Sequence, residues 1–185
     1  MISKNETLVE RVAFGDRPLR NETVTVNERT MGRTAKILAI ASEGHHWVEL
    51  LRLRPAFENL AVIYVTTHAK YESMVEGAPF RAVIEATRDT KVRTLVLFLQ
   101  VLWIVLRDRP TVIVTTGASP GYLAIRIGKW FGLKTLWIDS MAESEGLSPL
   151  CRLASKHANS TLTQWRHLEV SGTVDYRGSV VSSNS

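Results

Sequence analysis

Short apolar runs alternate with polar segments along the chain from residue 35 onward. Each run has the length and the aliphatic content of a strand that is buried on both faces of a sheet. The runs predict strands at residues 36–41, 61–66, 80–85, 111–115, 134–139 and 160–164. A last run at 174–181 is either a short strand or a connection that leaves the domain.

Helical patterns lie between these runs. Trp47, Leu50 and Leu51 have the spacing of one buried helix face. Pro55 should end or kink that helix because proline lacks an amide hydrogen. A longer helix, apolar on almost every side, is predicted at 92–107.

Two further helices are predicted to start at Ser-Pro pairs. Ser119 can cap the first of them, and Pro120 suits its first turn. Ser148 and Pro149 should start the second in the same way. The first helix should stop at Gly132 and carry these residues inward: Leu123, Ile127, Trp130 and Phe131.

Strands that alternate with helices predict an α/β fold, namely a Rossmann-like parallel sheet with helices on both faces. A chain of 185 residues is long enough for one such domain and short for two. We place the domain at 35–181 and expect a disordered polar tail at 1–34 and a short tail at 182–185. The sequence leaves open whether translation starts at Met1 or at Met31.

The composition argues against several classes of protein. The net charge of +5 is spread along the chain, which fits an anionic surface or a phosphate-bearing substrate and gives no support for a nucleic-acid partner. Cys151 is the single cysteine, so we expect a buried thiol in a reducing compartment. The polar N-terminus does not read as a signal peptide, which predicts a cytoplasmic protein. No hydrolase or metal-ligand motif is recognised, and we expect neither a metal nor a cofactor.

The loops that follow the strands are the candidate site, because ligands of open α/β sheets bind at the carboxyl ends of the strands. In the first loop a glycine allows close approach of a ligand, and the next helix offers free amides to a diphosphate. A histidine there can deprotonate a sugar hydroxyl, although a histidine near a helix start is more often a solvated or capping residue. The candidate residues of this loop are Ser42, Gly44, His45 and His46.

Two later loops complete this candidate site. Residues 116–121 are small and precede a helix, which suits a phosphate or a sugar, or only a tight turn. Residues 139–145 carry acids and hydroxyls that can bind sugar hydroxyls or act as a base, or that are ordinary solvated side chains. The candidate residues are Gly117, Ala118, Ser119, Asp139, Ser140 and Glu143.

The apolar segment 95–106 is too short to cross a bilayer core of about 30 Å. It is either a core helix or a helix whose exposed face dips into the headgroup region beside cationic residues. The residues expected to touch the membrane in the second case are Leu95, Phe98, Trp103 and Arg107.

Taken in order, the loop residues resemble a known family. Residues 42–53 are similar to the Ser-x-Gly-Gly-His start of oligosaccharide-biosynthesis subunits of the asparagine-linked-glycosylation type, which makes His46 the motif histidine. The bacterial relatives are exopolysaccharide glycosyltransferase subunits of the PssD type. The match continues through 115–122, 137–143 and 162–165. His45 replaces the second glycine of the motif and restricts the backbone there.

This resemblance implies the acceptor-binding N-terminal half of a GT-B enzyme. A separate small subunit would bind the UDP-sugar, and the acceptor would be a polyprenyl-diphosphate-linked saccharide. The reaction would be a metal-independent sugar transfer at the cytoplasmic face of the membrane, with His46 and Glu143 as the catalytic residues. Residues 176–181 resemble the crossover to a second domain, so the donor site is expected on the partner.

Two other functions are compatible with parts of the pattern. A non-catalytic scaffold that recruits the catalytic subunit to the membrane would use the same loops as an interface. A dinucleotide-dependent oxidoreductase is disfavoured, because the first loop lacks the glycine spacing and no acid follows the second strand at Thr66 and Thr67.

Overall fold

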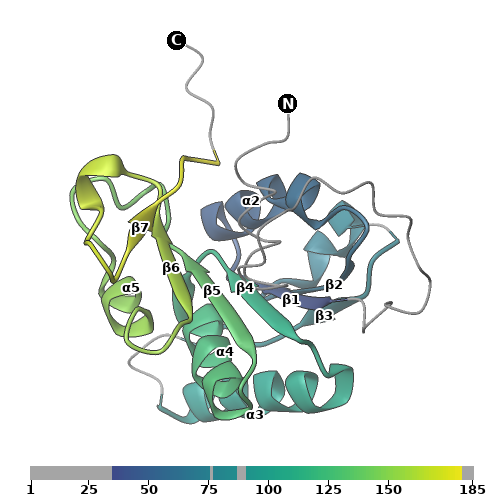
Figure 1. Cartoon of the computed structure of the whole chain (residues 1–185). Helices are drawn as coiled ribbons and strands as arrows, with labels where there is room; N and C mark the ends of the chain where they lie inside the picture. Colours follow the sequence, from purple (N-terminus) through teal and green to yellow (C-terminus); the bar gives the residue numbers. More distant parts are fainter. Residues whose placement is uncertain (1–34, 76, 87–90, 181–185) are drawn as a thin grey trace, which may run out of the picture.

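A computed structural model describes residues 35–75, 77–86 and 91–180. The tails predicted at 1–34 and 182–185, and position 181 at the end of the predicted domain, lie outside these described residues. Seven strands form one parallel sheet in the order β3-β2-β1-β4-β5-β6-β7 (Figure 1). The strands are β1 (Lys36–Ile40), β2 (Ala61–Thr66), β3 (Phe80–Ala82), β4 (Val112–Thr115), β5 (Lys134–Ile138), β6 (Ser160–Thr163) and β7 (Asp175–Tyr176).

The strand order reverses between β1 and β4, at the centre of the sheet. The chain builds outward from β1 to β3, returns, and then builds outward in the other direction from β4 to β7. Because Ile40 pairs with Thr115, β1 and β4 end side by side. Such a reversal leaves a crevice beyond the carboxyl ends of the two central strands. The loops after β1 and β4 are therefore neighbours.

Helices cover both faces of the sheet, as the sequence predicts. Alternate residues of β1 point to opposite faces, so Ile37 joins one core cluster and Leu38 joins the other. The first cluster packs under α2, and the second packs under α3 and α4. The helices are α2 (His45–Arg52), α3 (Lys91–Asp108), α4 (Ala118–Trp130) and α5 (Pro149–Ala154), with short 3-10 helices at Arg54–Phe57, Ala69–Val75 and Arg166–Leu168.

Three details of the sequence prediction are wrong. Helix α4 begins at Ala118 with Gly117 as its N-cap, so Ser119 lies inside the helix and caps nothing. Trp130 is 62% exposed rather than inward, because it lies at the edge of the core against Phe98 of α3, with 5.8 Å between the ring centroids. Phe131, where the helix has already ended, is also exposed.

The third difference is the length of β3, which stops at Ala82 instead of continuing to residue 85. The chain leaves the sheet there because the Ile84 amide donates to the Gln100 side chain of α3, at 2.9 Å, and not to a neighbouring strand. Cys151 and the Ser148 cap agree with the prediction, since the thiol is buried and the Ser148 hydroxyl accepts from the Cys151 amide.

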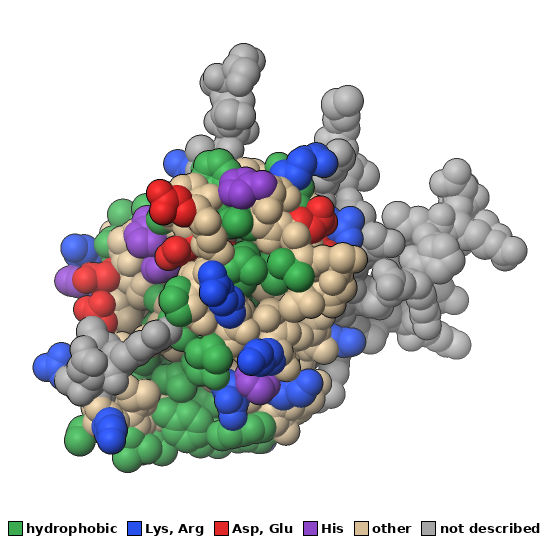
Figure 2. All heavy atoms as spheres, turned by 90° about the vertical axis from the view of Figure 1, so that its left-hand side faces the viewer, with side chains coloured by type: hydrophobic (Ala, Val, Ile, Leu, Met, Phe, Trp, Pro, Cys, Tyr) green, Lys and Arg blue, Asp and Glu red, His purple; other side chains and the backbone are tan. Residues whose placement is uncertain are grey.

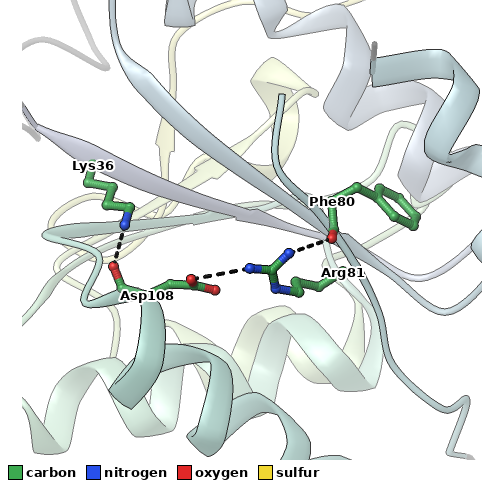
Figure 3. Close-up of polar contacts among 4 residues, drawn as sticks. All are labelled: Lys36, Phe80, Arg81 and Asp108. Atoms are coloured by element: carbon green, nitrogen blue, oxygen red, sulfur yellow. Dashed lines mark hydrogen bonds and ion pairs between the residues drawn. The ribbon is translucent and has the colours of Figure 1, made fainter. Parts of the chain in front are cut away.

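The end of α3 is fixed to the sheet by polar contacts (Figure 3). The Lys36 ammonium donates to the Asp108 carbonyl at 2.6 Å, where a cation also complements the negative end of the helix dipole. The Asp108 carboxylate lies 3.5 Å from the Arg81 guanidinium of β3. These contacts hold one face of α3 against the sheet and leave the opposite face outward.

Candidate functional site

His46 is the best-defined polar side chain at the carboxyl ends of β1 and β4. It stands in the first turn of α2, just after Gly44, whose φ of 79° suits glycine. His46 Nδ1 lies 2.9 Å from the Thr116 carbonyl oxygen, and the Thr116 hydroxyl donates to the His46 carbonyl at 2.6 Å. The two loops are thus joined through two reciprocal contacts.

The contact of Nδ1 with the Thr116 carbonyl fixes the tautomer of the neutral His46 ring. A carbonyl oxygen only accepts, so Nδ1 must carry the proton and Nε2 keeps the lone pair. Burial, and to a smaller extent the neighbouring His45, lower the pKa of His46 below its ordinary value of 6.5. A neutral imidazole with a free Nε2 lone pair has the chemistry of a general base near neutral pH.

The loop after β4 is shaped around this ring. Gly117 and Ala118 both adopt positive φ, 123° and 64°, and a Cβ on Gly117 would lie 3.0 Å from two atoms of the His46 ring. The Thr115 hydroxyl accepts from the Gly117 amide at 3.1 Å and holds the turn. A non-glycine residue in the left-handed region, here Ala118, is uncommon and costs conformational energy, which is typical of functional loops.

Asp139, one of the predicted sugar-binding residues, is engaged within the protein. Its carboxylate accepts from the Ser148 hydroxyl at 2.6 Å, from the Ser148 amide at 2.9 Å and from the Trp137 indole at 3.4 Å. The residue is 3% exposed. In this arrangement its carboxylate fastens the start of α5 to β5.

The other predicted residues differ in how they are placed. Ser42 is buried, while His45 is exposed and its ring centroid lies 4.1 Å from that of His46. Glu143 is partly exposed and held through its amide, which donates to the Ser140 carbonyl at 3.2 Å. No hydrogen bond links Glu143 to His46 within the described residues. The structure thus brings together His46, His45 and Gly117, and leaves Glu143 on a separate loop.

Glu49 and Gln164 are two buried polar residues near this site that the sequence analysis did not single out. Glu49 of α2 is 6% exposed, and its carboxylate accepts from Ser140, Met141 and Gln164. Burial raises the pKa of Glu49, and these donors oppose that rise. A signal was available in the sequence, because Glu49 lies one helical turn after His46 and directly precedes Leu50 of the buried helix face.

The outward face of α3 is apolar and bordered by cations. Leu95 is 58% and Trp103 is 54% exposed, and the Arg107 guanidinium lies 5.0 Å from the centroid of the Trp103 ring. Phe98, which was also expected to be outward, is partly buried against Trp130. Figure 2 shows hydrophobic side chains gathered along the lower part of the molecule, where α3 and the end of α4 lie in Figure 1.

The exposed apolar residues of this region define what we term the α3 face: Val92, Leu95, Val96, Leu99, Trp103, Leu106, Trp130 and Phe131. The exposed cations around it are Lys91, Arg93, Arg107, Arg109 and Lys129. None of the helices in residues 35–75, 77–86 and 91–180 has the length and apolar content needed to cross a bilayer. One side of the segment 95–106 packs into the core, and its other side is an exposed apolar surface.

The sequence matches no protein-family model and no curated protein. The fold, in contrast, matches solved structures. MurG from Acinetobacter baumannii superposes with a TM-score of 0.64 over 80% of this chain and 46% of that protein, at 10% identity. S. aureus MnaA, in a structure with UDP, gives 0.61 over 82% of this chain and 49% of that protein, at 14% identity.

A glycosyltransferase from Rickettsia africae ESF-5 gives a TM-score of 0.54 over 77% of this chain and 42% of that protein, at 11% identity. The chain thus spans just under half the length of each of these proteins. At such low identity the likeness concerns the fold. The chain has the fold of one GT-B half-domain.

Proposed function

We propose that this chain is the acceptor-binding, membrane-associated subunit of a two-component glycosyltransferase. In this proposal a small partner subunit binds a UDP-sugar, and the sugar passes to the hydroxyl of a polyprenyl-diphosphate-linked acceptor in polysaccharide or oligosaccharide biosynthesis. The likeness in fold supports a glycosyltransferase-type domain, since the chain superposes on one part of MurG, just under half of its length. The relation to the PssD-type and asparagine-linked-glycosylation subunits stays a prediction.

The observation that carries the proposal is the His46 ring at the central reversal of the sheet. Its Nδ1 is occupied by the Thr116 carbonyl, and its pKa is lowered, so Nε2 can accept the proton of an acceptor hydroxyl. The bond that forms joins this oxygen to the sugar carbon, the bond to the UDP oxygen breaks, and UDP leaves. Gly44 and the turn at Gly117 lie next to the ring, where they can approach the acceptor diphosphate or sugar.

The α3 face supports the proposal of membrane attachment. The free energy falls when exposed aliphatic and indole side chains enter the headgroup region. The surrounding cations are attracted to anionic lipids. The Arg107 and Trp103 pair offers both properties at one place. This surface would hold the subunit at the cytoplasmic leaflet, where a lipid-linked acceptor is anchored.

The proposal is tested by isolating the tagged chain from native membranes and identifying its partner by mass spectrometry. The purified pair is then assayed for transfer from labelled UDP-sugars to a polyprenyl-diphosphate-linked acceptor. Transfer that needs both proteins supports the proposal. A partner-free monomer that transfers nothing contradicts it. A scaffold would be indicated if alanine at His46 or Glu143 abolished partner binding, whereas a half-enzyme would keep the partner and lose turnover.

We expect the double variant Leu95→Ser and Trp103→Ser to bind vesicles at least about tenfold more weakly than the wild type. Each of these side chains contributes on the order of 1–2 kcal/mol when its exposed part is buried, and both are removed from the surface without opening the core. Co-sedimentation with vesicles that contain anionic lipid measures the change. Val170→Ser, which removes an exposed aliphatic side chain from the segment between the 3-10 helix Arg166–Leu168 and β7, is the control. Equal binding of all three proteins would exclude the α3 face as the contact.

A further inference from the structure

Glu49 is a buried carboxylate that accepts hydrogen bonds from three neighbouring groups. One oxygen accepts from the Ser140 hydroxyl at 2.8 Å and from the Met141 amide at 3.2 Å. The other accepts from the Gln164 side-chain amide at 3.0 Å. No salt bridge to Glu49 is present in residues 35–75, 77–86 and 91–180. The carboxylate is therefore compensated by three neutral donors.

Gln164 extends this network to the end of the described chain. Its Nε2 donates both to Glu49 and to the Asp139 carbonyl, each at 3.0 Å. Its Oε1 accepts from the Val180 amide at 3.0 Å and from the Ser179 hydroxyl at 3.4 Å. One side chain thus connects α2, the loop after β5 and the segment 177–180.

The direction of each bond in this network is fixed. If Gln164 turned its amide over, its oxygen would face the Asp139 carbonyl and its NH₂ would face the Val180 amide hydrogen. Glu49 for its part must accept on both oxygens. The network therefore has one satisfied arrangement, and a buried donor left without a partner is costly.

We infer that Glu49 and Gln164 are positioning residues that couple the loop after β5, which carries Glu143, to the C-terminal segment 177–180. Glu49 lies one turn after His46 on α2. The Glu49 and Gln164 pair therefore also holds the loop after β5 and the segment 177–180 in a fixed position relative to His46. A displacement of residues 177–180 by a partner or by the chain beyond would then be transmitted to the loop 140–143. This coupling is independent of the proposed function, since it concerns the free protein.

The test is hydrogen–deuterium exchange of the full chain, with each variant observed at amides to which the substituted side chain makes no hydrogen bond. Glu49→Gln keeps the shape of the side chain, but its single oxygen cannot accept from both the Met141 amide and the Gln164 amide group, which bind different oxygens of Glu49. We expect at least roughly tenfold faster exchange of the Val180 amide in this variant. Gln164→Glu keeps an acceptor for Val180 and repels Glu49, and it should speed the exchange of the Met141 and Glu143 amides.

The double variant Glu49→Gln with Gln164→Glu restores a donor opposite an acceptor between positions 49 and 164, although the Asp139 carbonyl still loses its donor. It should return the Val180 amide to within about threefold of the wild type, a rescue that a merely structural role would not produce. Glu145→Gln, an exposed carboxylate of the same loop, is the matched control and should change neither segment. Faster exchange at 140–143 without any change at Val180 in Glu49→Gln, or a uniform rise throughout the sheet, would overturn the inference.

If a single variant does not fold, Ser140→Ala replaces it. It removes the hydroxyl that donates to Glu49 and accepts from the Ala142 amide, so the exchange at Val180 decides the outcome. Faster exchange at both Glu143 and Val180 supports the coupling, and a change confined to Glu143 opposes it. Activity is not needed for this test. If the wild-type pair were inactive, the proposed function would be contradicted. The exchange rates would still test the coupling.

Discussion

Replacing His46 with alanine is expected to lower kcat of the reconstituted pair by about 10²- to 10⁴-fold, the usual contribution of a general base. The Thr116 carbonyl orients the ring, and the lowered pKa keeps Nε2 unprotonated, so the variant loses a pre-set proton acceptor. Partner binding should change little, and the free energy of unfolding should fall by about 1 kcal/mol because the Thr116 carbonyl loses its donor. His45→Ala is the matched control, because His45 is the exposed neighbour on the same turn.

The pH dependence of turnover is a second test of His46. Since the pKa of His46 is lowered from 6.5, the neutral base persists as the pH falls through that value, and turnover should decline only at more acid pH. The His46→Ala variant should lack this acid limb. Unchanged turnover of the variant, or an unchanged acid limb, would remove His46 from the chemistry.

Gly121→Ala is expected to destabilise the domain by about 1–3 kcal/mol, although alanine is ordinarily the better helix residue. A Cβ at this position would overlap the Thr115 hydroxyl and lie 3.0 Å from the Thr115 Cβ. Helix α4 would have to move away from β4, or Thr115 would have to give up the Gly117 amide that it now binds. Urea unfolding monitored by tryptophan fluorescence measures the change in free energy.

Gly146→Ala is the control for this experiment, because its nearest neighbour would be the end of the Arg152 side chain at 3.7 Å. That variant should unfold at nearly the wild-type urea concentration. If Gly121→Ala were as stable as Gly146→Ala, the close approach of α4 to β4 would not be tight. Because Thr115 shapes the turn beneath His46, Gly121→Ala should also lower turnover of the pair more than Gly146→Ala does.

Sequence signals that depend on a few adjacent residues predicted most of the strands and one helix start correctly. Apolar runs gave the strands, and the Ser148 cap and the Pro149 start of α5 are as predicted, because an N-cap depends on a few adjacent residues. Ser119 looked like the same signal but is not a cap, since the turn at Gly117 starts the helix earlier. The sequence could not show that Ser148 is a cap and Ser119 is not. The turn at Gly117 depends on its contact with His46, a residue far away in the chain.

The candidate site was predictable in its location and less so in its roles. Parallel strands place their following loops at one edge, so the sequence could identify the loops at 42–46, 116–121 and 139–145. It could not show that Ser148 occupies the Asp139 carboxylate, or that Glu49 is buried against three donors. The same polar residue types serve both binding and structure, and only the partners distinguish them.

The sequence by itself determined the α/β class, the order of strands and helices and the buried faces of most of them. These depend on apolar spacing and on short-range capping, which the chain carries locally. Only the tertiary structure decided that the His46 Nδ1 donates to the Thr116 carbonyl, that α3 has an exposed apolar face and that Glu49 connects to Val180 through Gln164. Each depends on side chains that come together when the sheet forms, so burial and hydrogen-bond direction, rather than residue type, fixed them.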